Sequence, residues 1–155
     1  MSLKARAYKS PSMMFLKKEY EAMKFYDDTH KSKYDEFCKK MKYLDEYHRA
    51  VAYLFALDKV CREHIGDIFD FAEDGIIREG LHKGWQTSTS RRTTHLAFNL
   101  WNSCCSDGET YKDNQGYEDE LPSVEYTPDH IFCDGYAEYY FEAVRLRFPD
   151  YCDET

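Results

Sequence analysis

The sequence predicts a compact all-α domain, a bundle of about six or seven helices. Apolar residues recur at helical spacing along most of the chain, no segment shows the strict alternation of a half-buried strand, and 14 Tyr, 10 Phe and 2 Trp supply core material. A length of 155 residues suits one domain. We therefore expect a single helical domain over residues 1–155, in which residues 1–11 are flexible and residues 103–124 form a long acidic loop.

Four helices are expected in the first half of the chain. The first covers about residues 13–28 and the second about residues 33–41. The third, over residues 45–57, has the clearest signal, because its apolar residues follow the spacing of one helix face. These residues are Tyr47, Ala50, Val51, Leu54 and Phe55. Asp58 is placed to cap the fourth helix, over residues 58–71.

In the second half of the chain, the sequence predicts a short helix, a long helix and a final helical region. One or two helical turns are expected around residues 79–82, and a longer helix over residues 88–103 follows a polar tract with several candidate caps. Pro128 opens the last helical region and Pro149 ends it. Its core side consists of Ile131, Phe132, Tyr136, Tyr140, Val144 and Phe148. The main core helices are expected near residues 45–57, 58–71, 88–103 and 134–148.

Charge changes sign along the chain. Residues 1–43 carry a net charge of +5, residues 44–103 of −2 and residues 104–155 of −11, within a formal charge of −8. The basic and acidic ends could pair within the fold, pair between copies, or face different partners. Because an acidic protein repels nucleic acid at long range, nucleic acid is disfavoured as a partner.

Composition also excludes several classes of protein. No apolar run reaches the roughly 20 residues of a membrane span, and the start of the chain has no apolar export signal, so we expect a cytoplasmic protein without membrane contact. The six cysteines lack Cys-x2-Cys spacing and are expected to be free thiols. The six histidines add no ligand pair of the usual spacing. The sequence therefore implies no metal site and no cofactor.

The most distinctive segment runs from Trp85 to His95. It places hydroxyl groups and two guanidinium groups around the start of a helix, where free backbone N–H groups favour a bound phosphate or carboxylate. The candidate anion-binding residues are Trp85, Gln86, Thr87, Ser88, Thr89, Ser90, Arg91, Arg92 and His95. In the structural alternative, the hydroxyls cap the helix, the arginines pair with acids of the C-terminal third, and Trp85 fills the core.

Other chemistry finds less support in the residues. A helix-turn-helix reading of this segment would use Arg91 and Arg92 for DNA contacts, and its binding would weaken steeply with salt. Two histidines lie one helical turn from an aspartate, but charged helix surfaces often carry such pairs. These pairs are His48 with Asp45 and His64 with Asp67. Motifs for a phosphate-binding loop, a serine nucleophile or a zinc protease are absent from the sequence, so no catalytic residue is assigned.

Three segments taken together resemble a known family. They are residues 47–54, the run from residue 68 through Leu81-His82-Lys83-Gly84-Trp85-Gln86-Thr87 to residue 101, and residues 139–151. They resemble a family of small proteins of unknown function from Gram-positive bacteria of the clostridial kind and their mobile elements. The resemblance covers about residues 44–103 and 126–152. It implies no activity, cofactor or catalytic residue.

The function is therefore unknown from the sequence, and two classes of function are considered. The first is a non-enzymatic binding or adaptor protein with a protein partner, in contact through the helix start from Trp85 to Arg92. A phosphate-bearing ligand and a homo-oligomer stay open. The alternative is a small enzyme that acts on a phosphorylated or nucleic-acid substrate, held by Arg91, Arg92 and His95. A buried cluster of histidine and carboxylates facing the helix start would favour the enzyme, and an exposed tyrosine patch would favour the adaptor.

Overall fold

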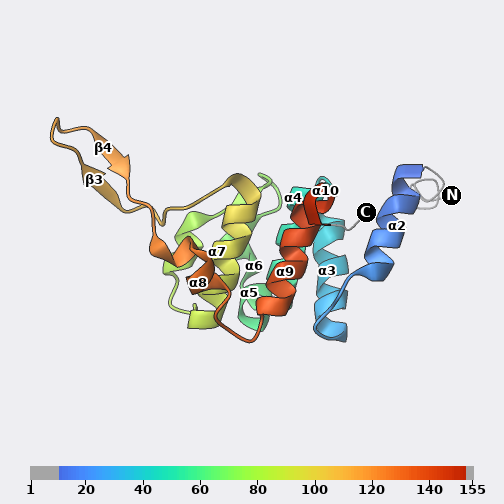
Figure 1. Ribbon diagram of the computed structural model, residues 1–155. Helices are drawn as coiled ribbons and strands as arrows, with labels where there is room; N and C mark the ends of the chain where they lie inside the picture. Colours follow the sequence, from blue (N-terminus) through green and yellow to red (C-terminus); the bar gives the residue numbers. More distant parts are fainter. Residues whose placement is uncertain (1–10, 153–155) are drawn as a thin grey trace.

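The computed structural model describes residues 11–152 and shows a mostly helical protein (Figure 1). The elements are α2 (Pro11–Ala22), α3 (Asp28–Lys40), α4 (Glu46–Leu57), α5 (Lys59–Glu63), α6 (Ile65–Ile68), β1 (Phe69–Asp70), β2 (Gly75–Ile76), the 3-10 helix η1 (Arg78–His82), α7 (Ser88–Asn102), β3 (Thr110–Lys112), β4 (Glu118–Glu120), the 3-10 helix η2 (Val124–Tyr126), α8 (Pro128–Ile131), α9 (Ala137–Arg147) and α10 (Pro149–Cys152). The helical prediction is confirmed in outline. Two small antiparallel sheets, β1–β2 and β3–β4, correct the expectation of an all-α fold.

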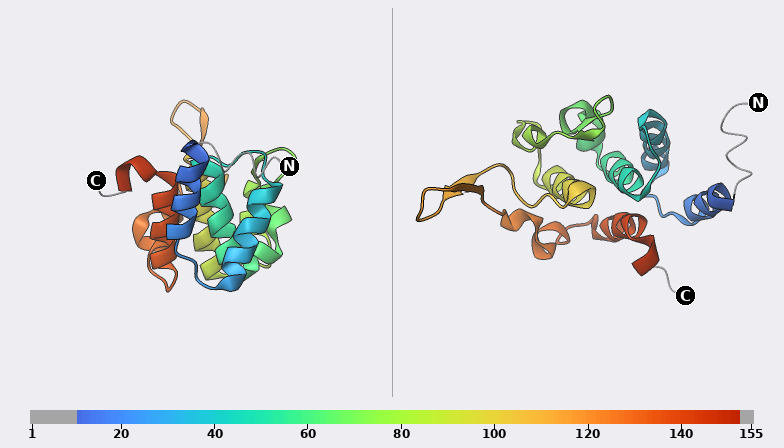
Figure 2. Two further views of the ribbon diagram at one scale, coloured as in Figure 1. Left: turned by 90° about the vertical axis from the view of Figure 1, so that its right-hand side faces the viewer. Right: turned by 90° about the horizontal axis from the view of Figure 1, so that it is seen from above.

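Helix α4 lies at the centre of the molecule. Every residue from Ala50 to Leu57 is at most 1% exposed, because α3, α7 and α9 all pack against this helix. Figure 2 shows these helices side by side, with α2 at one end of the molecule and the β3–β4 hairpin at the other. The sequence predicted one apolar face for this segment, whereas the structure buries all its sides.

Aspartate caps set where three of the helices begin. Asp27, Asp45 and Asp58 each accept a hydrogen bond from a backbone N–H three residues later, at 2.7, 3.0 and 2.9 Å. The cap at Asp58 confirms the prediction. Asp27 caps α3, so the first helix ends at Ala22 rather than near residue 28. The expected flexibility of residues 1–11 falls almost entirely outside the described residues.

The single helix predicted over residues 58–71 is wrong, because it is divided at His64 and ends at Ile68. The backbone leaves helical geometry at His64, and the chain continues as the short helices α5 and α6. Phe69 then pairs with Ile76 in the β1–β2 hairpin. Two residues per strand give too short an alternation to be seen in a sequence pattern.

The C-terminal third also differs from its prediction. The expected loop over residues 103–124 contains the β3–β4 hairpin. The single helical region expected after Pro128 is divided into α8, α9 and α10, and Pro149 begins α10 instead of only ending α9. Phe148, expected in the core, is 37% exposed and lies against the Arg147 guanidinium, 4.5 Å from the ring centroid.

An aromatic cluster joins α3 to α4 around the buried side chain of His30. The His30 ring contacts Phe25, Tyr53 and Tyr139, with centroid distances of 5.2, 4.5 and 6.5 Å. Its Nδ1 accepts a hydrogen bond from the Tyr26 backbone at 3.0 Å, so Nε2 carries the proton and donates to the Tyr53 carbonyl at 2.9 Å. Burial lowers the pKa of His30 to about 4. The neutral ring is therefore the form that fits the core.

Two further expectations concern membranes and thiols. None of the helices in the described part of the chain combines the length and apolar character needed to cross a membrane. All six cysteines lie within the described residues and none forms a disulfide, which confirms the free thiols.

Protonation of His30 predicts a loss of stability in mild acid. The unfolded chain takes up this proton near pH 6.5 and the folded chain only near pH 4, so stability is full above about pH 6.5 and falls between these values by roughly 3 kcal/mol. His30→Gln keeps an N–H donor without a titrating ring. We expect denaturant unfolding between pH 7 and 4 to show a smaller loss for His30→Gln than for the parent protein.

The control for this measurement is His130→Gln, because His130 is an exposed histidine. Between pH 7 and 4, this variant should lose as much free energy of unfolding as the parent protein. Equal losses in His30→Gln and the parent would contradict the role of His30.

Candidate functional site

The start of α7 is closed by a capping box. Thr87 Oγ1 accepts a hydrogen bond from the Ser90 backbone at 3.0 Å, and Ser90 Oγ accepts one from the Thr87 backbone at 2.7 Å. Ser90 Oγ also donates to Gln86 Oε1 at 2.6 Å. Hydroxyls of the predicted anion site are thus engaged in capping.

The two arginines of this segment pair with acids of the C-terminal third. Arg91 donates to the Leu81 carbonyl at 2.5 Å and to Glu125 Oε2 at 2.9 Å. Arg92 lies 3.4 Å from Asp134 Oδ2. These contacts are the ones described by the structural alternative. Anion binding at this helix start stays a prediction.

Trp85 and Gln86 tie the same segment to its neighbours. Trp85 Nε1 donates to Asp67 Oδ2 at 2.8 Å, and its ring stacks on the His64 ring with centroids 4.5 Å apart. Gln86 Nε2 donates to the Gly80 carbonyl at 3.2 Å. His64 therefore stacks on an aromatic ring, and Asp67 bonds to the indole.

The structure brings His95 of α7 together with two carboxylates. His95 Nε2 lies 3.1 and 3.2 Å from the two oxygens of Asp107 and 3.5 Å from Glu125 Oε2. The His95 side chain is 2% exposed, that of Asp107 11% and that of Glu125 45%. Burial outweighs the attraction of Asp107 and lowers the pKa of His95. The lowered pKa favours the neutral ring, the form that binds metal ions. We call these three residues the His95 cluster.

Neighbouring groups hold the His95 cluster in place. The Tyr126 ring packs edge-on against the His95 ring, with centroids 4.5 Å apart. His82 Nε2 lies 3.1 Å from the Asp107 carbonyl, and Arg91 donates to Glu125. Burial raises the pKa of Tyr126, so its hydroxyl stays protonated. Each member of the cluster thus has a second partner that orients it.

Sequence reasoning found His95 and Arg91 but missed Asp107 and Glu125. Asp107 lies in the segment expected to be a loop, residues 103–124, and Glu125 directly follows it; the two acids stand 12 and 30 positions after His95. A single sequence has no periodic pattern that would reveal this contact, because the fold of the intervening hairpin creates it. The acidic composition of residues 104–155 was the only signal, and many acids share it.

The β3–β4 hairpin extends away from the helices (Figure 1). Every residue from Gly108 to Pro122 is exposed. We call residues 109–121 the arm. Its base closes with hydrogen bonds from Leu121 N to the Glu109 carbonyl at 2.7 Å and from Ser123 N to the Cys105 carbonyl at 2.8 Å. Its tip turns at Gly116, whose φ of 84° lies in the left-handed region that favours glycine.

The two faces of the arm differ in chemistry. Tyr111 pairs with Asp119, and a backbone bond pairs Asp113 with Tyr117, so these four side chains share one face. Tyr111 is 46% exposed and Tyr117 71%. The opposite face carries Thr110, Lys112, Glu118 and Glu120. Arg78 donates two hydrogen bonds to Glu120, of 2.7 and 3.1 Å, and so connects this second face to η1.

A third buried histidine, His48, lies between two aspartates. His48 Nδ1 is 2.6 Å from Asp45 Oδ1, and Nε2 is 2.7 Å from Asp74 Oδ1. The Trp101 ring packs edge-on against it, with centroids 4.8 Å apart. Burial of Asp45 opposes ionisation, but hydrogen bonds from His48 outweigh it and lower the pKa of Asp45. The pair predicted between His48 and Asp45 is confirmed. Through its second contact, with Asp74, His48 links the start of α4 to the β1–β2 turn.

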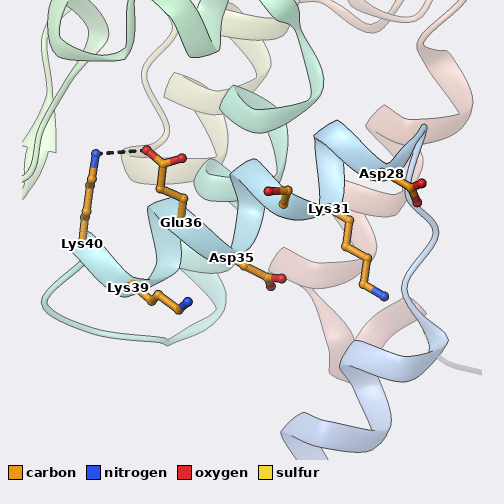
Figure 3. Close-up of a pocket in the computed structure, with 7 residues that line it drawn as sticks. Asp28, Lys31, Asp35, Glu36, Lys39 and Lys40 are labelled. Atoms are coloured by element: carbon orange, nitrogen blue, oxygen red, sulfur yellow. Dashed lines mark hydrogen bonds and ion pairs between the residues drawn. The ribbon is translucent and has the colours of Figure 1, made fainter.

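A shallow surface hollow lies on α3 (Figure 3). Its lining residues are Asp28, Lys31, Ser32, Asp35, Glu36, Lys39 and Lys40. Acidic and basic side chains alternate along this helix face, and Lys33 and Lys40 both pair with Glu36, at 2.8 and 3.2 Å. This arrangement is typical of a solvated helix surface.

Comparison with known proteins gives one family match. A family model for DUF6075, described as a family of unknown function, matches residues 20–155. No curated protein and no solved structure matches the chain.

The packing of η1 on α6 predicts a site-specific steric effect. A Cβ at Gly80 would lie 2.6 Å from Ile68 Cγ2 and closer still to the Asp67 carbonyl oxygen, whereas a Cβ at Gly84 meets nothing within 4 Å. We expect Gly80→Ala to lower the free energy of unfolding by about 1–3 kcal/mol. The matched control, Gly84→Ala, should stay within about 0.5 kcal/mol of the parent. Denaturant unfolding measures both, and equal stabilities would contradict this packing.

Proposed function

The chain belongs to DUF6075, a family of unknown function, and we propose that it is a non-enzymatic binding protein whose arm holds a basic segment of a protein partner. The observation that carries this proposal is the tyrosine face of the arm. Two exposed tyrosines and two aspartates gather there on an element that leaves the helical body.

The chemistry of the arm specifies the kind of partner. Residues 109–121 contain five acidic residues and one lysine, so the arm attracts cations. Exposed tyrosine rings bind guanidinium and ammonium groups through cation–π contacts, and neighbouring carboxylates add charge-assisted hydrogen bonds. An extended segment rich in Arg or Lys satisfies both kinds of group.

The anchoring of the arm supports the same function. Arg78 and the two backbone hydrogen bonds at the base hold the arm through its second face and its roots. The side chains of the tyrosine face take part in none of these contacts. A partner can therefore bind without breaking the bonds that fix the arm to the body.

A small enzyme is the second candidate, and the buried pair of His95 and Asp107 favours it. A buried cluster of histidine and carboxylates facing the start of α7 was the feature expected to favour an enzyme, and this pair provides part of it. The arginines expected to hold a phosphorylated substrate, Arg91 and Arg92, are instead engaged with Glu125 and Asp134. The binding function is therefore the better supported of the two.

The proposed partner chemistry predicts binding of a labelled oligoarginine peptide. Replacing both Tyr111 and Tyr117 with Ala should weaken this binding about fivefold to thirtyfold, because two exposed cation–π contacts contribute about 1–2 kcal/mol. Fluorescence anisotropy at low and moderate salt measures the dissociation constant.

The matched control replaces two exposed tyrosines outside the arm, Tyr43 and Tyr151, with Ala. This variant should bind like the parent. If both double variants bind like the parent, or if they weaken equally, the arm is not the binding surface.

The anion site has a test of its own. We expect replacement of both Arg91 and Arg92 with Ala to weaken binding of inorganic phosphate while the helical circular dichroism spectrum stays unchanged, because both residues lie at the surface of α7 rather than in the core. Thermal shift against phosphate concentration measures the binding. An unchanged phosphate response would remove the anion site, and with it the residues expected to hold the substrate of the enzyme alternative.

A further inference from the structure

We propose that the His95 cluster is a binding site for a divalent transition-metal ion of the zinc type. One imidazole nitrogen and carboxylate oxygens of two acids converge there, and these ligand atoms all lie within 4.8 Å of one another. Such a spacing lets one ion reach all three with small side-chain movements, because zinc lies about 2 Å from each nitrogen or oxygen ligand.

The ligand set indicates the class of ion. Imidazole binds zinc, copper, iron and nickel, whereas carboxylates alone suit magnesium, calcium and manganese. A set of one imidazole and two carboxylates therefore favours a borderline ion such as Zn²⁺ over Mg²⁺. Three protein ligands leave a fourth position of a tetrahedral ion for water.

The local geometry gathers three carboxylate oxygens around one imidazole nitrogen. His95 Nε2 lies 3.1 and 3.2 Å from the two oxygens of Asp107 and 3.5 Å from Glu125 Oε2, so carboxylates of two acids face the same ring atom. The His95 side chain is only 2% exposed. In the tautomer that carries its proton on Nδ1, Nε2 presents a lone pair to the space between the two carboxylates.

Surrounding residues supply the orientation that metal ligands usually need. Arg91 holds Glu125 through Oε2, which leaves Oε1 free of that contact, and His82 meets the carbonyl of Asp107. The two carboxylates carry two negative charges and Arg91 offsets one of them. The remaining negative charge favours a cation.

The position of the site means that a bound ion would connect the arm to α7. His95 belongs to α7, Asp107 precedes the arm and Glu125 follows it. An ion bound by all three would fasten both roots of the arm to α7. This inference is independent of the proposed partner, because the ion needs only residues of this chain.

The experiment uses Co²⁺, which stands in for Zn²⁺ and reports its ligands by absorption. Chelator-treated protein should bind one Co²⁺ with visible d–d bands and without the thiolate charge-transfer band of cysteine ligation. Asp107→Asn and Glu125→Gln should each weaken binding at least about tenfold. Glu125 is half-exposed, so its variant reports on the site even if Asp107→Asn fails to fold, which thermal unfolding in chelator reveals.

The matched control is the exposed pair of His130 and Asp129, 3.4 Å apart. The double variant His130→Gln, Asp129→Asn should bind Co²⁺ like the parent, and Zn²⁺ should displace Co²⁺ while Mg²⁺ should not. Three results would overturn the proposal: no Co²⁺ binding, binding that Asp107→Asn and Glu125→Gln leave unchanged, or a thiolate charge-transfer band.

Discussion

Burial of α4 is the constraint on which the rest of the structure depends. Residues 50–57 are closed off from solvent on all sides, and the helices that close them, α3, α7 and α9, come from three separate parts of the chain. Full burial of apolar side chains of this size stabilises a fold by about 1.5–3 kcal/mol each for the larger ones. The covering helices are held in place because each of them removes α4 from water.

The site inherits its position from this arrangement. One side of α7 packs on α4 with Ala97 and Phe98 buried, and another side carries Arg91 and His95 toward the roots of the arm. The arm itself contributes nothing to the core, since every one of its residues is exposed. The helical body therefore carries an element whose residues are all exposed, as the proposed contact with a partner requires.

The sequence predicted the parts of the fold that are governed by local patterns. Helical spacing located α4 and α7, and the capping role of Asp58 followed from its side chain. The β1–β2 hairpin escaped prediction because its strands have two residues each, and the β3–β4 hairpin because neither of its faces is buried. Neither produces the alternation by which strands are identified. The contact of His95 with Asp107 and Glu125 depends on how that second hairpin returns, which is a tertiary property. Thus the start of α7 was found from sequence, and the residues that it meets were not.

Amide hydrogen exchange of the free protein, followed by mass spectrometry, tests whether a helical body built around α4 carries an arm outside its core. We expect amides of residues 50–57 to exchange only through global unfolding and to show the greatest protection, while those of residues 110–120 exchange far faster through local opening. Fast exchange in α4, or protection of the arm equal to that of α4, would contradict it.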